Sequence, residues 1–157
     1  MVETTATRSG TVAVAMALPP SLVPLLIPFR QSGASEAEIT AAEILLGQRL
    51  PEDYREVLRF SNGMEGMISP RAYVSLWSVA DLPELNAGYS VSEFIPGMVL
   101  FGTDGGGVGY GVTTSHPGPK YVRVDLVGMG SDPPMTLGNS FEEFLNSLAR
   151  GVDTGSQ

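Results

Sequence analysis

The stretch SEAEITAAEILLGQRLPEDYREVLRFSNG, residues 35–63, predicts two helices joined by a tight turn. Ser35 followed by Glu38 has the spacing of a capping box, in which a hydroxyl and a carboxylate each accept a backbone N–H. Gly47 suits the left-handed position that ends many helices. The helical period places four apolar residues of this first helix on one face: Ile39, Ala42, Leu45 and Leu46.

The second helix is predicted to begin at Pro51, because a missing N–H costs nothing at the first helical position. Glu52 and Asp53 follow in the first turn, where the helix dipole favours anions. Asn62 and Gly63 end the helix. Its apolar face carries Tyr54, Val57, Leu58, Phe60 and Ser61. Two amphipathic helices this short need a sheet or a further layer to cover their apolar faces.

The rest of the chain predicts a mostly antiparallel sheet. Strands are expected at residues 73–77, 98–101, 108–113, 120–127 and, as a short edge strand, 135–137. The glycine-rich turn at 102–107 joins two of these strands into a hairpin. In the 120–127 strand, Tyr121, Arg123 and Asp125 alternate with Val122, Val124 and Leu126, which predicts two different faces.

The segments between these strands give weaker signals. Residues 64–70 are predicted to be a loop, and residues 86–96 to be irregular. Ser78 has the position of an N-cap, which predicts a brief helical turn through Leu85.

A last helix follows Ser140, which forms a second capping-box pattern with Glu143 and precedes Gly151 as the helix end. Its apolar face consists of Phe141, Phe144, Leu145 and Leu148. The predicted fold class is therefore α+β, a mostly antiparallel sheet with helices packed against it. We expect an N-terminal extension at 1–20, a single domain at 21–151 and a disordered tail at 152–157.

The N-terminal segment leaves alternatives open. Residues 11–18 are apolar and end in a small-residue pattern typical of a secretory signal, but Glu3 offsets Arg8, so a clear positive n-region is missing. Four prolines interrupt the apolar run before it reaches membrane-spanning length. We expect a loose N-terminus through about residue 18, a packed apolar segment at 21–29, and a cytoplasmic protein.

Composition limits the function classes. The chain has 157 residues, which suits one domain with a sizeable core. Its net charge of −8 argues against nonspecific binding of DNA or RNA, whose phosphates need Lys and Arg, and it permits a basic partner. An acidic balance that only keeps the protein soluble is an equally good explanation. The sequence has no Cys, which excludes disulfides and thiolate chemistry.

No motif predicts catalysis or a cofactor. The glycines between 102 and 111 lack both the G-x-G-x-x-G and the P-loop spacing, so they indicate a structural hairpin. His116 is the single histidine and is expected on a surface loop, which leaves no zinc set. Glu52, Asp53 and Glu56 could be read as acid–base carboxylates; dipole partners and a solvated helix face explain them better.

One charge pattern points to a partner. Residues 72–119 contain no Lys or Arg. Within them lie the acids Asp81, Glu84, Glu93 and Asp104 and the aromatics Trp77 and Tyr89. An unneutralised acidic face with aromatic anchors suits a basic protein partner, so these six residues are the predicted partner-binding set. Solvated loops are the alternative interpretation.

The ordered set of motifs resembles the SUKH superfamily of the Smi/Knr type. The pieces that carry the resemblance, over roughly residues 33–151, are Glu43, LPEDY at 50–54, SNG at 61–63, the segment 73–77, Asn86 with Tyr89, PGMVLFGTDGGG at 96–107 and FEEFL at 141–145. The resemblance implies structural roles for Glu43, Leu50, Pro51, Tyr54, Asn62, Gly63, Gly102, Asp104, Gly105, Phe141 and Phe144.

The resemblance also implies a function. Bacterial SUKH-type proteins are viewed as immunity proteins that bind and neutralise toxins of polymorphic toxin systems. Related fungal domains act as regulators and scaffolds in cell-wall synthesis. A small acidic domain favours the immunity role, with a basic toxin domain as partner. A regulatory or scaffold domain is the alternative, and an enzyme is disfavoured. We expect no cofactor, no metal, no direct nucleic-acid binding and no membrane partner.

Overall fold

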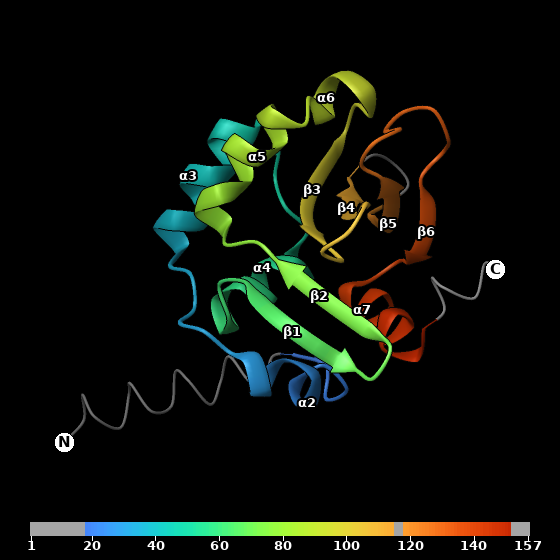
Figure 1. The fold of residues 1–157 in the computed structure, drawn as a ribbon. Helices are drawn as coiled ribbons and strands as arrows, with labels where there is room; N and C mark the ends of the chain where they lie inside the picture. The colour runs from blue at the N-terminus through green and yellow to red at the C-terminus, as the bar shows by residue number, and fades with distance from the viewer. Residues whose placement is uncertain (1–17, 115–117, 152–157) are drawn as a thin grey trace.

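The computed structural model describes residues 18–114 and 118–151 and shows a six-stranded antiparallel sheet in the order β1-β2-β3-β4-β5-β6 (Figure 1). The strands are β1 (Met64–Ser69), β2 (Ala72–Leu76), β3 (Met98–Thr103), β4 (Val108–Thr113), β5 (Lys120–Asp125) and β6 (Met135–Gly138). Each strand pairs with the next along the chain. The predicted α+β class with a mostly antiparallel sheet is confirmed.

The sheet bends between β2 and β3, where only the pairs Ser75–Thr103 and Leu76–Gly102 form. A Cβ on Gly102 would lie 2.7 Å from the Ser75 carbonyl oxygen, so this close crossing requires glycine. Beyond it, the β1–β2 hairpin diverges from the other four strands (Figure 1). The bend leaves part of the β3 edge without a strand partner.

Helices precede, interrupt and follow the strands. They are α2 (Val23–Leu26), the 3-10 helix η1 (Ile27–Phe29), α3 (Glu36–Leu46), α4 (Glu52–Phe60), the 3-10 helix η2 (Val79–Asp81), α5 (Leu82–Gly88), α6 (Val91–Phe94) and α7 (Phe141–Arg150). The capping box of α3 is confirmed: Ser35 Oγ accepts the Glu38 N–H at 3.1 Å, and Glu38 Oε1 accepts the Ser35 N–H at 2.8 Å. Pro51 is the N-cap of α4 and not its first helical residue, so the helix begins at Glu52, one residue later than predicted.

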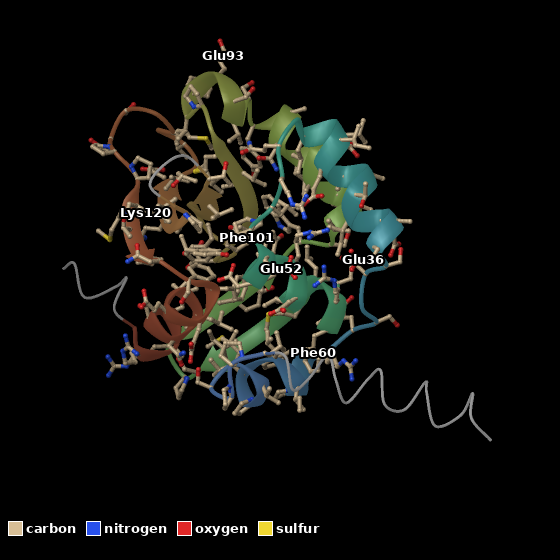
Figure 2. All side chains as sticks on the ribbon, turned by 180° about the vertical axis from the view of Figure 1, so that it is seen from behind. Glu36, Glu52, Phe60, Glu93, Phe101 and Lys120 are labelled. Carbon is tan, nitrogen blue, oxygen red and sulfur yellow. The ribbon has the colours of Figure 1, made fainter. Side chains whose placement is uncertain are left out.

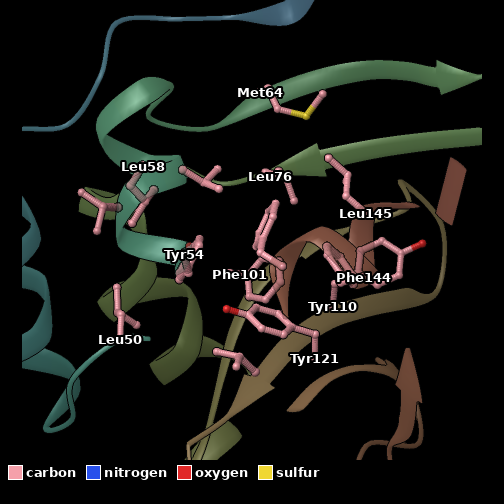
Figure 3. Close-up of a cluster of buried hydrophobic side chains, with 14 of the residues drawn as sticks. Leu50, Tyr54, Leu58, Met64, Leu76, Phe101, Tyr110, Tyr121, Phe144 and Leu145 are labelled. Carbon is pink, nitrogen blue, oxygen red and sulfur yellow. The ribbon is translucent and has the colours of Figure 1, made fainter. Parts of the chain in front are cut away.

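The main core lies between the sheet and helices α4 and α7, and aromatic rings fill its centre (Figure 3). Phe101 of β3 contacts Tyr54 of α4 at 4.9 Å and Phe144 of α7 at 5.4 Å between ring centroids. Tyr121 of β5 packs edge-on against Phe141. These aromatic rings therefore hold both helices on one face of the sheet.

A second, smaller core covers the opposite face of the same strands. It contains Val91, Met98, Leu100, Val122, Val124 and Met129. The predicted alternation of β5 is confirmed, because Tyr121 belongs to the main core while Val122 and Val124 belong to this one. Strands β3 and β5 therefore pack against a hydrophobic core on each face.

Several local predictions were wrong. Residues 64–70 do not form a loop: they supply β1, whose glycine and polar residues gave a weak strand signal that pairing with β2 overrides. Residues 86–96 are not irregular throughout, since α5 reaches Gly88 and α6 follows.

Two predicted caps also differ from the structure. Ser78 precedes η2 but caps no backbone group; its hydroxyl donates to the Asp81 carboxylate. The Ser140 box is half formed, because Glu143 accepts the N–H of Asn139 instead of that of Ser140.

The packed segment at 21–29 is confirmed, since Leu22 and Leu26 are buried in the main core. Leu18 is also buried, at 4% exposure. The domain limits themselves stay a prediction. The predictions for residues 1–17, for His116 and for the tail 152–157 lie outside the described residues. Among the described helices, none has the length and apolar character needed to cross a membrane.

Candidate functional site

Helix α5 lies on the part of the β3 edge that β2 leaves open (Figure 1). Asn86 attaches it there. The side-chain amide of Asn86 accepts the Leu100 N–H and donates to the Leu100 carbonyl, both at 2.8 Å, and it also donates to the Leu82 carbonyl. The amide thus makes the two hydrogen bonds to Leu100 that a neighbouring strand would otherwise make. These bonds fix α5 on the edge of the sheet.

The start of this helical segment is held by the end of α4. Asn62 Oδ1 accepts the Val79 N–H at 2.7 Å. Gly63 has φ +90°, and a Cβ there would lie 2.8 Å from the Leu76 carbonyl oxygen. The two signature residues therefore bring the α4 end, β2 and η2 together, and so determine where α5 begins.

Three of the predicted partner-binding acids lie on this helical segment. Asp81 ends η2, Glu84 is in α5 and Glu93 is in α6, and all three side chains are exposed. Figure 2 shows Glu93 projecting from the outer end of the molecule. No salt bridge involving them occurs within residues 18–114 and 118–151. We call Asp81, Glu84 and Glu93 the acidic face.

The two predicted aromatic anchors lie together beside the acidic face. The rings of Trp77 and Tyr89 stack nearly parallel, 6.4 Å apart. Trp77 is half-buried and packs against both cores, so it supports the fold as well as the surface. Tyr89, at 37% exposure, is the ring that a partner can reach. Phe94 in α6 is also exposed, and the sequence analysis did not select it.

Asp104 lies apart from Glu93 of α6. It follows the far end of β3, whereas α6 precedes the near end, and six strand residues separate the two by roughly 20 Å. Asp104 Oδ1 accepts the N–H groups of Gly106 at 2.8 Å and Val108 at 3.2 Å. It lines the same hollow as Arg71. These hydrogen bonds hold the turn between β3 and β4.

An apolar surface lies on the other side of α5. Leu45 was predicted to face the core, but it is 74% exposed, as is Ile44. Helix α3 packs through Ile39 and Ala42 instead. Three consecutive apolar residues, Ile44 to Leu46, cannot all face inward from one helix. This run was the sequence signal that some of these side chains are exposed.

The carboxylates of α4 have structural partners. Asp53 accepts the Tyr121 hydroxyl at 2.6 Å, the Phe141 N–H at 2.7 Å and the Tyr54 N–H at 2.8 Å. Burial raises the pKa of the Tyr121 hydroxyl above its usual range, which keeps it a donor. Asp53 therefore joins α4, β5 and α7. The sequence predicted only that its carboxylate interacts with the helix dipole.

Two arginines of α4 organise the remaining carboxylates. Arg59 bonds both Glu36 and Glu52, and its hydrogen bonds lower the pKa of each carboxyl. Arg55 pairs with the same two acids and lies 3.3 Å from Glu43, an ion pair without hydrogen-bond geometry.

Glu43 also accepts the Leu50 N–H at 2.8 Å, which closes the turn between the helices. These contacts favour the structural interpretation of the α4 acids over acid–base catalysis. Within the described ranges, no His, Cys, Asp and Glu side chains gather into a group of three or more that could hold a metal.

A curled antiparallel sheet with helices fixed along its open edge defines an α+β domain. The chain belongs to the SMI1/KNR4 family (SUKH-1), because the family model matches residues 33–147, about three-quarters of its length. This confirms the family resemblance. Comparison with curated proteins finds no match.

Proposed function

We propose that this protein is an immunity protein that binds a cognate bacterial toxin through the acidic face and thereby neutralises it. The observation that carries the proposal is the charge of this surface. Asp81, Glu84 and Glu93 are exposed and form no salt bridge within the described part of the chain, and no Lys or Arg occurs anywhere on η2, α5 or α6. SUKH domains are generally non-catalytic, which agrees with a role in binding.

An unneutralised set of carboxylates suits a partner with a basic surface. Charge complementarity of this kind mainly accelerates encounter and rejects partners of the wrong sign. Nucleases and other toxins that act on polyanions carry such basic surfaces. A toxin of this class would therefore be attracted by the acidic face that repels nucleic acid.

Affinity requires anchors as well as charge. Interfaces draw most of their binding energy from a few buried aromatic or large side chains. Tyr89 supplies an exposed ring at the border of the acidic face, and Trp77 holds that ring by stacking against it. Because both lie on segments fixed by Asn86 and Asn62, the anchor is pre-organised before binding.

The test is neutralisation in cells. A toxin encoded beside this gene should stop growth when expressed alone and should be tolerated when this protein is co-expressed. The Asp81→Lys/Glu84→Lys/Glu93→Lys variant should lose protection at equal abundance, whereas Glu56→Lys on α4 should keep it. A regulatory or scaffold domain, the alternative function, would bind its partner without abolishing the partner's activity. Full protection by the triple variant would contradict the proposed surface.

A further inference from the structure

A groove between α3 and α5–α6 is not explained by the fold or by the acidic face. Its volume is about 150 Å³, and its lining combines apolar Leu45, Leu46, Pro83, Ala87 and Met98 with polar Gln48, Asn86 and Ser92. Ile44 stands beside it on α3 with the same 74% exposure as Leu45. Exposed aliphatic side chains next to a hollow are typical of interaction sites, since neither side chain gains burial in the free protein.

The size of the groove limits what it can take. An enclosed apolar cavity of about 150 Å³ holds a molecule the size of benzene, and this open, partly polar groove has a similar volume. The groove therefore has room for one aromatic or branched aliphatic side chain, but not for a drug-sized ligand. Pro83 and Ala87 lie one helical turn apart on α5 and contribute short side chains to the groove.

The three helices beside the groove carry charge of one sign. Glu84 follows the lining residue Pro83, and Glu93 follows the lining residue Ser92; both acids are exposed. Neither α3, α5 nor α6 contains a Lys or Arg. Arg49 follows the lining residue Gln48 beyond the end of α3 and lines a different hollow with Pro51 and Thr114. A side chain entering the groove therefore comes from a segment that carries basic residues on its flanks.

We propose that this groove is the affinity-determining pocket of the interface and receives one large apolar side chain from a Lys- and Arg-bearing helix of the toxin. The proposal rests on the proposed function and identifies the chemistry of the partner. The acidic face would steer the basic segment, and Leu45, which lines the groove next to the exposed Ile44, would bury the anchor. Helix-in-groove binding of this kind needs an apolar face on the incoming helix.

A synthetic peptide tests the groove without the toxin. The probe is an amphipathic helix with Leu and Trp on one face and Lys on the other, and its control is a scrambled peptide of the same composition. In a titration of the ¹⁵N-labelled full chain, the amphipathic peptide should shift the amide signals of Leu45, Ala87 and Ser92. The scrambled peptide should bind more weakly. Equal binding of both peptides, or shifts away from the groove, would overturn the proposal.

Substitutions separate the groove from general charge attraction. The Ile44→Ser/Leu45→Ser variant should bind the peptide at least about tenfold more weakly, and Ala87→Gln should do so by filling the opening. Val127→Ser is the matched control, since Val127 is exposed in the loop after β5, and it should bind as the parent protein does. Unchanged affinity in both groove variants would contradict the proposal.

The two proposals fail in different ways. If the peptide binds the groove while the neighbouring toxin does not bind the protein, only the proposed function is wrong. If the toxin binds the Ile44→Ser/Leu45→Ser variant as tightly as the parent, the groove is not the pocket, although the immunity function stands.

Discussion

At the residue scale, Asp53 shows how a surface position becomes a structural centre. One carboxylate accepts the Tyr121 hydroxyl and two backbone N–H groups from α4 and α7. Hydrogen bonds to a charged group stabilise more than neutral ones, and a donor left buried without a partner is costly. The side chain therefore fixes the relative positions of two helices and a strand.

Asp53→Ala should lower the free energy of unfolding by about 2–4 kcal/mol, because two buried donors lose their acceptor. Glu56→Ala on the same helix is the matched control and should change it by less than about 0.5 kcal/mol. Chemical denaturation of both variants measures the difference. If the two variants unfold alike, the three bonds of Asp53 do not stabilise the fold.

Single residues also mark where the sequence was informative. Ser35, Gly47 and the aromatic residues of α4 and α7 were predictable, because caps and helical periodicity are local signals. The exposure of Leu45 was not predictable, because its position in the helical period fits the buried face. Only the packing of α3 against its neighbours leaves this side chain in solvent. Asn86 was recognised as part of a motif, but its role as a substitute strand depends on the divergence of β2, which no local pattern encodes.

At the element scale, the helix caps are the features whose effect on stability can be predicted most directly from the sequence. Ser35→Ala should cost about 0.5–2 kcal/mol, because the Glu38 N–H loses its side-chain acceptor while the backbone N–H of residue 35 keeps its bond to Glu38. Ser140→Ala should cost a similar amount through the single bond to the Glu143 N–H. Denaturation midpoints measure both effects, and an unshifted midpoint in either variant would mean that the cap does not hold the helix start.

The pairing of α3 with α4 should depend on pH. Arg59 lowers the pKa of Glu36 and Glu52 in the folded protein, so the pairs stabilise the fold above the unfolded pKa near 4.5. That stability is lost as the pH falls through the lower folded pKa values. The stability difference between the parent protein and Arg59→Gln should therefore be largest near neutral pH and shrink in acid.

Denaturation of both proteins at a series of pH values measures this difference. Arg150→Gln, at the end of α7, is the control and should show no such narrowing. A difference that stays constant with pH would mean that the ion pairs do not link the two helices.

At the scale of the whole molecule, one part of the fold forms the core and another part presents the candidate binding surface. The aromatic core and Asp53 hold α4 and α7 on one face, and this part was largely predictable because its residues are periodic and apolar. The open β3 edge carries α5 and α6, which present the acidic face and the groove. The sequence indicated the acids, but it could not separate Asp104 from Glu93, because strand length and direction place these two at opposite ends of β3.

Association kinetics test the central claim, that the acidic face attracts a basic toxin. The rate constant for association of the neighbouring-gene toxin should fall steeply between about 50 mM and about 500 mM salt, because screening shortens the reach of the exposed carboxylates. The Asp81→Lys/Glu84→Lys/Glu93→Lys variant should associate more slowly at low salt and lose most of the salt dependence. Association that is independent of salt, and unchanged in this variant, would contradict the account.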